Sequence, residues 1–179
     1  MSGMGELWRS LAASLPASAR VVGVDLSSEM VRRARRSWHF PVEVHVEDVL
    51  TWGPSPAFAD VLVSSFGLKT FDHEQQQQLA QKVAELLKTG AAFSFIEVSV
   101  PRFPVLRWTY MLYLKRVIPI VGKILLGNPD CYRMLGVYTE AFQNVSHFAS
   151  CLRAAGLTTT EVSYFFGCAT GVRGIKPPV

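Results

Sequence analysis

The sequence predicts an α/β fold with a mainly parallel β-sheet, and three observations support this prediction. Short runs rich in β-branched residues alternate with longer amphipathic stretches, which is the pattern of successive βαβ units. The 179 residues suit one domain with a sizeable core, and 49% of them are hydrophobic. Only 18% are charged, so the composition excludes an intrinsically disordered chain.

The N-terminal part of the chain predicts two helices and two strands. Residues that favour helix ends bound the helices, because Pro16 ends the first and Ser27 or Ser28 caps the second. Each strand is a short run of mostly β-branched residues. In order, the elements are a helix over Glu6–Leu15, a strand over Arg20–Asp25, a helix over Ser27–Arg36 and a strand over Val42–Val46.

The middle of the chain repeats this alternation after a loop rich in proline and glycine, Trp52–Pro56. The run DVLVSS predicts a strand over Asp60–Ser65, and AFSFIEV predicts another over Ala92–Val98. Between them, a helix is expected to begin at Asp72 and run to about Leu87, with Gly90 as its C-cap.

The last third is expected to cover and complete the sheet. Residues 99–143 are too many for a loop and too apolar for disorder, so they predict a helical insertion over the sheet. A helix follows over Glu140–Ala155, stopped by Gly156. The chain then ends in an antiparallel hairpin of two strands, Thr158–Phe166 and Ala169–Gly174.

Charge and cysteine content narrow the functional classes. The formal net charge of +4 at pH 7 favours anionic ligands or membrane surfaces without requiring them. The arginines between positions 32 and 36 are typical of a solvated helix face, so we expect no nucleic-acid partner. Three cysteines in no metal-ligand spacing predict a reducing, cytoplasmic setting and no metal site. Basic residues and Pro119 interrupt the apolar window Val105–Leu126, which argues against a membrane span.

Two glycines near the N-terminus and an acidic residue about 20 positions later indicate a nucleoside site. Gly3 and Gly5 precede the first helix, and Asp25 ends a predicted strand. Such a turn exposes backbone N–H groups, and the carboxylate can accept both ribose hydroxyls. Trp8 stands where the dinucleotide fingerprint needs a third glycine, which disfavours NAD. No GKS or GKT sequence is present to form a triphosphate loop.

Four segments, SGMGE, VVGVDLSSEM, the acidic pair Glu47-Asp48 and DVLVSSFGLKTFD, occur in the order found in class I S-adenosylmethionine-dependent methyltransferases. The sequence resembles in particular the ubiquinone/menaquinone biosynthesis C-methyltransferase family, with further similarity in LLKTGAAFSFIEVSVP and FFGCATGVRGIKP. The resemblance covers essentially the whole chain. It implies a Rossmann-like mainly parallel sheet with the helical insertion and the C-terminal hairpin predicted above, and S-adenosylmethionine as cofactor.

The resemblance also implies cofactor contacts around the carboxyl ends of the strands. It assigns the methionine moiety to Gly3 and Gly5, the ribose to Asp25, the adenine to Leu26, Met30, Asp48 and Val49, and the floor near the sulfonium to Ser65 and Phe66. Other interpretations of these residues stay open. The two glycines could form only a flexible terminus, Met30 and Phe66 could be core residues, and Asp48 could cap a loop.

Carbon methylation of an aromatic ring needs an ionised ring hydroxyl and a group that removes the ring proton. The candidates are Lys69, Asp72, His73 and Glu97. The family usually carries an arginine at the position of Lys69, and lysine lacks the planar guanidinium fork. Asp72 could instead be a helix N-cap, and His73 a solvated residue of the first helical turn.

The insertion is rich in aromatic and basic residues, which suits a lid over a small aromatic or polyprenylated ring substrate, peripheral contact with a membrane, or the domain's own core. We also consider a homodimer. Two functional alternatives remain, an inactive protein that binds only a cofactor or a partner, and an O- or N-methyltransferase.

In the family, a strand precedes the glycine turn. Here Ser2-Gly3 follows Met1 directly, so we expect that this central strand is absent from the sequence given.

Overall fold

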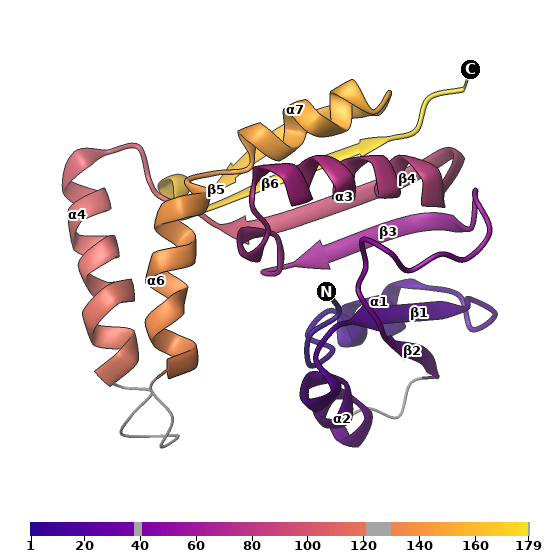
Figure 1. Ribbon diagram of the computed structural model, residues 1–179, viewed down its shortest axis with the longest axis horizontal. Helices are drawn as coiled ribbons and strands as arrows, with labels where there is room; N and C mark the ends of the chain where they lie inside the picture. Colours follow the sequence, from indigo (N-terminus) through magenta and orange to yellow (C-terminus); the bar gives the residue numbers. More distant parts are fainter. Residues whose placement is uncertain (38–40, 121–129, 179) are drawn as a thin grey trace.

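The computed structural model describes residues 1–37, 41–120 and 130–178, and it confirms the predicted α/β fold (Figure 1). Its helices are α1 (Trp8–Ser14), α2 (Ser28–Ser37), α3 (His73–Leu86), α4 (Pro104–Leu112), α6 (Asp130–Phe142) and α7 (Ser146–Ala154). Three short helical segments join them, namely η1 (Leu68–Thr70), the π-helical η2 (Tyr113–Val117) and η3 (Phe165–Gly167).

The described strands form two sheets. β1 (Val21–Asp25) and β2 (Val42–Val46) pair in parallel as the first sheet. The second sheet has the order β3-β4-β6-β5, with β3 parallel to β4 and β6 antiparallel to both of its neighbours. Its strands are β3 (Ala59–Ser65), β4 (Leu87–Val98), β5 (Thr158–Tyr164) and β6 (Ala169–Ile175). The predicted C-terminal hairpin is confirmed, although its first strand ends at Tyr164, because η3 begins at the next residue.

Helices α3 and α7 lie side by side along the four-stranded sheet, and their apolar faces form the core with it (Figure 1). Aromatic packing links the layers, because the rings of Phe95 in β4 and Phe148 in α7 meet edge to face with centroids 5.0 Å apart. The start of α3 is fixed by a capping box. The Asp72 carboxylate accepts the Gln75 amide at 2.8 Å, and the Gln75 side chain accepts the Asp72 amide at 3.0 Å.

Two predicted helix ends are wrong. Gly90 is not a C-cap, because α3 ends at Leu86 and Gly90 lies inside β4 with φ +80°. There the register between β3 and β4 shifts, and the left-handed conformation suits glycine at such an irregularity. The single helix expected over Glu140–Ala155 is divided into α6 and α7, because Gln143 has φ +59° and turns the chain between them.

The described part of the predicted insertion is helical. α4 runs into η2, and α6 returns beside them, so the helices project together from one end of the sheet (Figure 1). They share a small apolar core that contains Met111 and Leu114 and packs against Val100, just beyond β4. The predicted position over the sheet is therefore wrong for the described part of the insertion, which extends the fold beyond the carboxyl end of β4 and has a small core of its own.

The two sheets meet at a seam between β1 and β3, which do not pair with each other among the described residues. A cavity of about 120 Å³ lies along this seam and is lined from both strands, by Val22 and Val24 on one side and Leu62 and Ser64 on the other. The Ser64 hydroxyl and that of Ser2 are buried there without a hydrogen-bond partner in the described part of the chain. That a central strand is missing from the sequence remains a prediction.

Candidate functional site

A cleft of about 570 Å³ opens at the carboxyl ends of β1, β2 and β3. In a parallel α/β sheet this edge is where ligands bind. Eight of the nine predicted cofactor residues line the cleft, namely Gly3, Asp25, Leu26, Met30, Asp48, Val49, Ser65 and Phe66. The cleft straddles the seam, because Asp25 ends β1 and Ser65 ends β3.

Asp25 is the charged centre of the cleft. Its Oδ2 accepts the Gly3 amide at 2.8 Å and lies 3.1 Å from the Met1 ammonium, while Oδ1 accepts the Ser27 amide at 2.9 Å. Partial burial would raise the pKa of Asp25, but the hydrogen bonds from Ser27 and Gly3 and the nearby ammonium outweigh it and lower the pKa. Asp25 is therefore held as a carboxylate, oriented by the backbone on either side of it.

Apolar side chains surround this carboxylate without being buried. Leu26 is 71% exposed, Phe66 51% and Met30 37%. Met30 and Phe66 are thus not core residues, which settles that alternative. A carboxylate beside exposed apolar surface suits a ligand with a flat apolar part and a polyhydroxylated part.

Phe66 also has a left-handed backbone, with φ +61°, directly after β3. A bulky residue adopts this conformation only where the surrounding structure holds it. The Lys69 ammonium supplies one such restraint by donating to the Phe66 carbonyl oxygen at 2.6 Å.

Two further predicted cofactor residues have local structural roles. Asp48 lines the cleft but also caps its loop, because its Oδ1 accepts the Leu50 amide at 2.9 Å. Gly5 is absent from the cleft lining. It has φ +85°, and a Cβ atom there would meet the Trp8 ring at 2.6 Å. Glycine at position 5 is therefore required by the packing of Trp8.

Three of the four catalytic candidates, Lys69, Asp72 and His73, line a neighbouring cavity of about 460 Å³ that shares Phe71 with the cleft. Lys69 is almost buried and donates to Glu97 twice, from Nζ to Oε1 at 2.9 Å and from its amide to Oε2 at 3.0 Å. Asp72 caps α3, as described above. The His73 ring stacks on His147 of α7, with centroids 4.1 Å apart. The structure thus gathers Lys69, Asp72 and His73 around one cavity and gives each a structural partner.

Sequence reasoning missed several residues of the cleft. Met4 stands between the two predicted glycines and lines the cleft, as do Glu6, Thr70, Phe71 and Gln75. Phe71 lies within the quoted motif DVLVSSFGLKTFD, so its position was available as a signal. No sequence signal marked Gln75 as a residue of the cleft, because its place in the lining depends on where the first turn of α3 lies.

Two features are absent from the described residues. No set of three or more His, Cys, Asp or Glu side chains is placed to hold a metal ion. No described helix has both the length and the apolar character needed to span a membrane.

The arrangement resembles that of a solved methyltransferase. Human N-acetylserotonin methyltransferase, whose structure contains SAM, aligns with a TM-score of 0.66 at 18% identity. The alignment covers 99% of this chain and 46% of that protein. At this identity the likeness concerns the fold.

Sequence comparison identifies the family. The demethylmenaquinone methyltransferase of Chlorobaculum parvum is 31% identical, over 89% of this chain and 64% of its own length. The ubiquinone/menaquinone biosynthesis C-methyltransferase UbiE of Syntrophotalea carbinolica is 30% identical, over 93% of this chain and 73% of its own. The chain thus spans less than two thirds of the first relative. The sequence pattern of the ubiE/COQ5 methyltransferase family matches residues 1–176, and the chain belongs to this family.

Proposed function

We propose that the chain binds S-adenosylmethionine in the cleft and transfers its methyl group to a carbon of a small aromatic, quinone-type ring. The observation that carries the proposal is the oriented Asp25 carboxylate beside the apolar walls of the cleft. Family membership supports methyl transfer, and the names of the two relatives support a quinone-type ring.

The residues of the cleft suit this cofactor. A carboxylate has about four acceptor positions, and the Gly3 amide, the Ser27 amide and the Met1 ammonium use three on Asp25. One position on Oδ1 is left for a ribose hydroxyl. Leu26 and Met30 offer apolar surface to the adenine ring, and the cleft volume lies within the range of about 300–1,000 Å³ for small-molecule sites.

Bound S-adenosylmethionine supplies a methyl group already activated by a sulfonium, so the protein contributes chiefly alignment and charge placement. Asp25 fixes the ribose end of the cleft. Lys69, anchored by Glu97, holds the Phe66 carbonyl and so acts as a positioning residue for the cleft floor. We assign the ring substrate, with or without a polyprenyl chain, to the neighbouring cavity, where Asp72 and His73 are the candidates for moving the ring proton.

One observation favours a second candidate, a cofactor-binding protein without methyl transfer. The Lys69 ammonium already contacts Glu97 and the Phe66 carbonyl, so in this arrangement it is not directed to a ring oxygen. For either candidate we propose a cytoplasmic location. The thiols of Cys151 and Cys168 are free, which accords with a reducing compartment.

Isothermal titration with S-adenosylhomocysteine tests the cofactor. The wild-type chain should bind, and Asp25→Ala should bind about 10- to 150-fold more weakly, since hydrogen bonds to a charged group contribute about 1.5–3 kcal/mol. Asp60→Ala is the matched control, because Asp60 is an exposed carboxylate paired with Lys88 outside the cleft. Failure of the wild type to bind, or equal affinity of Asp25→Ala, contradicts the cofactor assignment.

Product mass spectrometry, followed by NMR of the product to locate the added methyl group, separates the proposed function from its alternatives. The chain is incubated with S-adenosylmethionine and, in turn, a 1,4-dihydroxynaphthalene, a catechol and a primary amine. Methylation at a ring carbon of the dihydroxynaphthalene is the expected result. Methylation at oxygen or nitrogen alone indicates the O- or N-methyltransferase, and no product despite S-adenosylhomocysteine binding supports the second candidate.

A further inference from the structure

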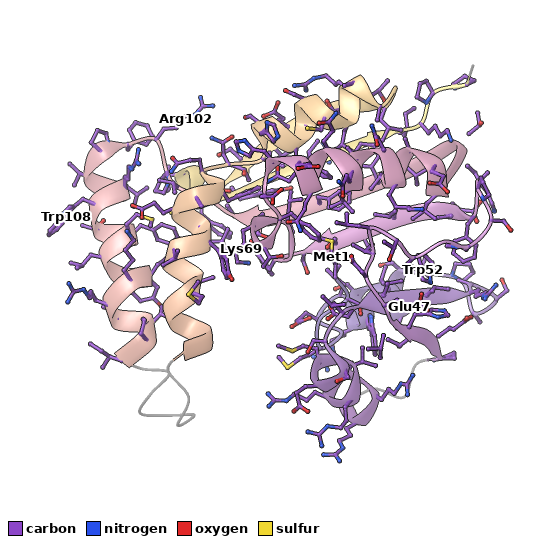
Figure 2. All side chains as sticks on the ribbon, in the orientation of Figure 1. Met1, Glu47, Trp52, Lys69, Arg102 and Trp108 are labelled. Atoms are coloured by element: carbon purple, nitrogen blue, oxygen red, sulfur yellow. The ribbon has the colours of Figure 1, made fainter. Side chains whose placement is uncertain are left out.

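One side of α4 carries apolar side chains that the protein's own core does not use. Val105 is 78% exposed, Trp108 68% and Leu112 45%. Their spacing of three and four residues places them on one face of the helix. Met111, one turn after Trp108 and at the border of this face, is buried in the small core of the insertion. Figure 2 shows Trp108 pointing away from the rest of the molecule.

Exposed aromatic residues continue this surface beyond the start of α4. Phe103 is 64% exposed, and Phe166 in η3 is 81% exposed. Both line one cavity of about 310 Å³ together with Arg102, so the two segments are neighbours. Phe165 and Phe166 have φ of 49° and 56°, a conformation that costs roughly 1–2 kcal/mol for a residue other than glycine. The backbone thus holds two aromatic side chains in water at an energetic cost.

We call these six residues the apolar patch: Phe103, Val105, Trp108, Leu112, Phe165 and Phe166. Soluble monomers rarely expose contiguous apolar surface of this kind unless it has an interaction role. The apolar patch is separate from the cleft described above, because none of the six residues lines that cleft.

The charge around the apolar patch is mainly positive, although Glu140 and Glu161 also line the two cavities beside it. Residues 99–129 contain five basic residues and no acidic one. A groove of about 420 Å³ along α4 is lined by Arg107, Trp108, Lys115 and Arg116. Lys115 pairs with Glu140 at 2.5 Å, whereas no ion pair joins Arg107 or Arg116 to another described residue. Positive charge that is not neutralised locally is thus placed beside exposed tryptophan and aliphatic side chains.

We propose that the apolar patch docks on the surface of an anionic lipid bilayer, with Arg107 and Arg116 contacting lipid phosphates. An amphipathic helix with aromatic and aliphatic residues on one side and basic residues at its border is suited to the membrane interface. Tryptophan favours the headgroup level, and each basic residue there adds attraction to anionic lipid. The docking goes beyond the proposed function, since it requires neither cofactor nor methyl transfer.

Vesicle co-sedimentation of the full chain tests the docking. Vesicles of phosphatidylcholine with 30% phosphatidylglycerol (about 0.3 mole fraction) should bind the chain at least tenfold more tightly than pure phosphatidylcholine, and about 0.5 M salt should weaken this binding. Trp108→Ser and the double variant Arg107→Gln/Arg116→Gln should each lower the affinity about tenfold or more. The matched double variant Arg9→Gln/Arg36→Gln, which removes the same charge elsewhere, should lower it less.

Three outcomes overturn the proposal. They are equal binding to neutral and anionic vesicles, no effect of the two α4 variants, and self-association of the wild type that Trp108→Ser abolishes. The last result would assign the apolar patch to a second copy of the chain. Each variant is also titrated with S-adenosylhomocysteine, and retained affinity shows that the fold is intact. Failure of docking is thus distinguishable from failure of the proposed function.

Discussion

Replacing Glu97 with leucine should destabilise the protein more than most single substitutions. Glu97 is fully buried and accepts three hydrogen bonds, from Nζ and the amide of Lys69 and from the Val98 amide. Its loss leaves the Lys69 ammonium, whose side chain is 8% exposed, with the Phe66 carbonyl as its remaining partner. Removing one partner of a buried ion pair costs about 3–5 kcal/mol. For a chain of this length, that lowers Tm by about 6–20 °C.

Urea unfolding followed by circular dichroism measures this loss, and a second variant isolates its cause. In Glu97→Leu/Lys69→Met both charges are gone, so the free energy of unfolding should recover to within about 1–2 kcal/mol of the wild type. Conversely, Lys69→Met alone should be about as unstable as Glu97→Leu. A single-variant loss below about 1 kcal/mol, or a double variant as unstable as Glu97→Leu, would refute the reasoning.

Three further predictions concern other parts of the fold. Because the folded-state pKa of Asp25 is lowered, its stabilising contribution is present above the unfolded-state pKa of about 3.9 and is lost as pH falls through the folded value. Urea midpoints between about pH 5 and 2 should therefore fall more steeply for wild type than for Asp25→Asn. Gly174→Ala should cost at least about 2 kcal/mol in urea unfolding, since its Cβ would lie 1.7 Å from the Thr158 carbonyl oxygen, whereas Gly53→Ala, with 3.7 Å to its nearest neighbour, should be nearly neutral. Asp72→Ala removes the α3 cap and should lower the free energy of unfolding by about 1 kcal/mol in the same assay.

The sequence predicted the strands and most of the residues that line the cleft, because both depend on local patterns. RVVGVD and DVLVSS each mark a strand and also name the residue at its carboxyl end, so Asp25 and Ser65 could be expected at one edge of the sheet. The cofactor role of Gly5 stays a prediction, while the close approach of the Trp8 ring to it is a three-dimensional constraint that the sequence pattern does not show. Helix ends were less predictable, since the turn at Gln143 depends on a residue that carries no strong turn signal.

The catalytic candidates show a second limit of sequence reasoning. Lys69 and Glu97 are 28 positions apart, and only the pairing of β3 with β4 brings their side chains together. In the sequence, Lys69 and Glu97 are two separate candidates for a group that acts on the substrate. Their mutual contact assigns them first to fixing the floor of the cleft, a role that spacing along the chain does not indicate.

The seam between β1 and β3 has a consequence for binding. The cleft is lined from both sheets, by Asp25 on one and Ser65 on the other, while no strand pairing joins the sheets in the described chain. If the unit formed by β1, α2 and β2 opens as a separate cooperative unit, the observed dissociation constant is the intrinsic one divided by the closed fraction. A ligand that spans the seam then favours the closed state, and hydrogen exchange in β1 and β2 should slow when it binds. Ligand binding in the cleft and closure of the two sheets against each other are therefore thermodynamically linked.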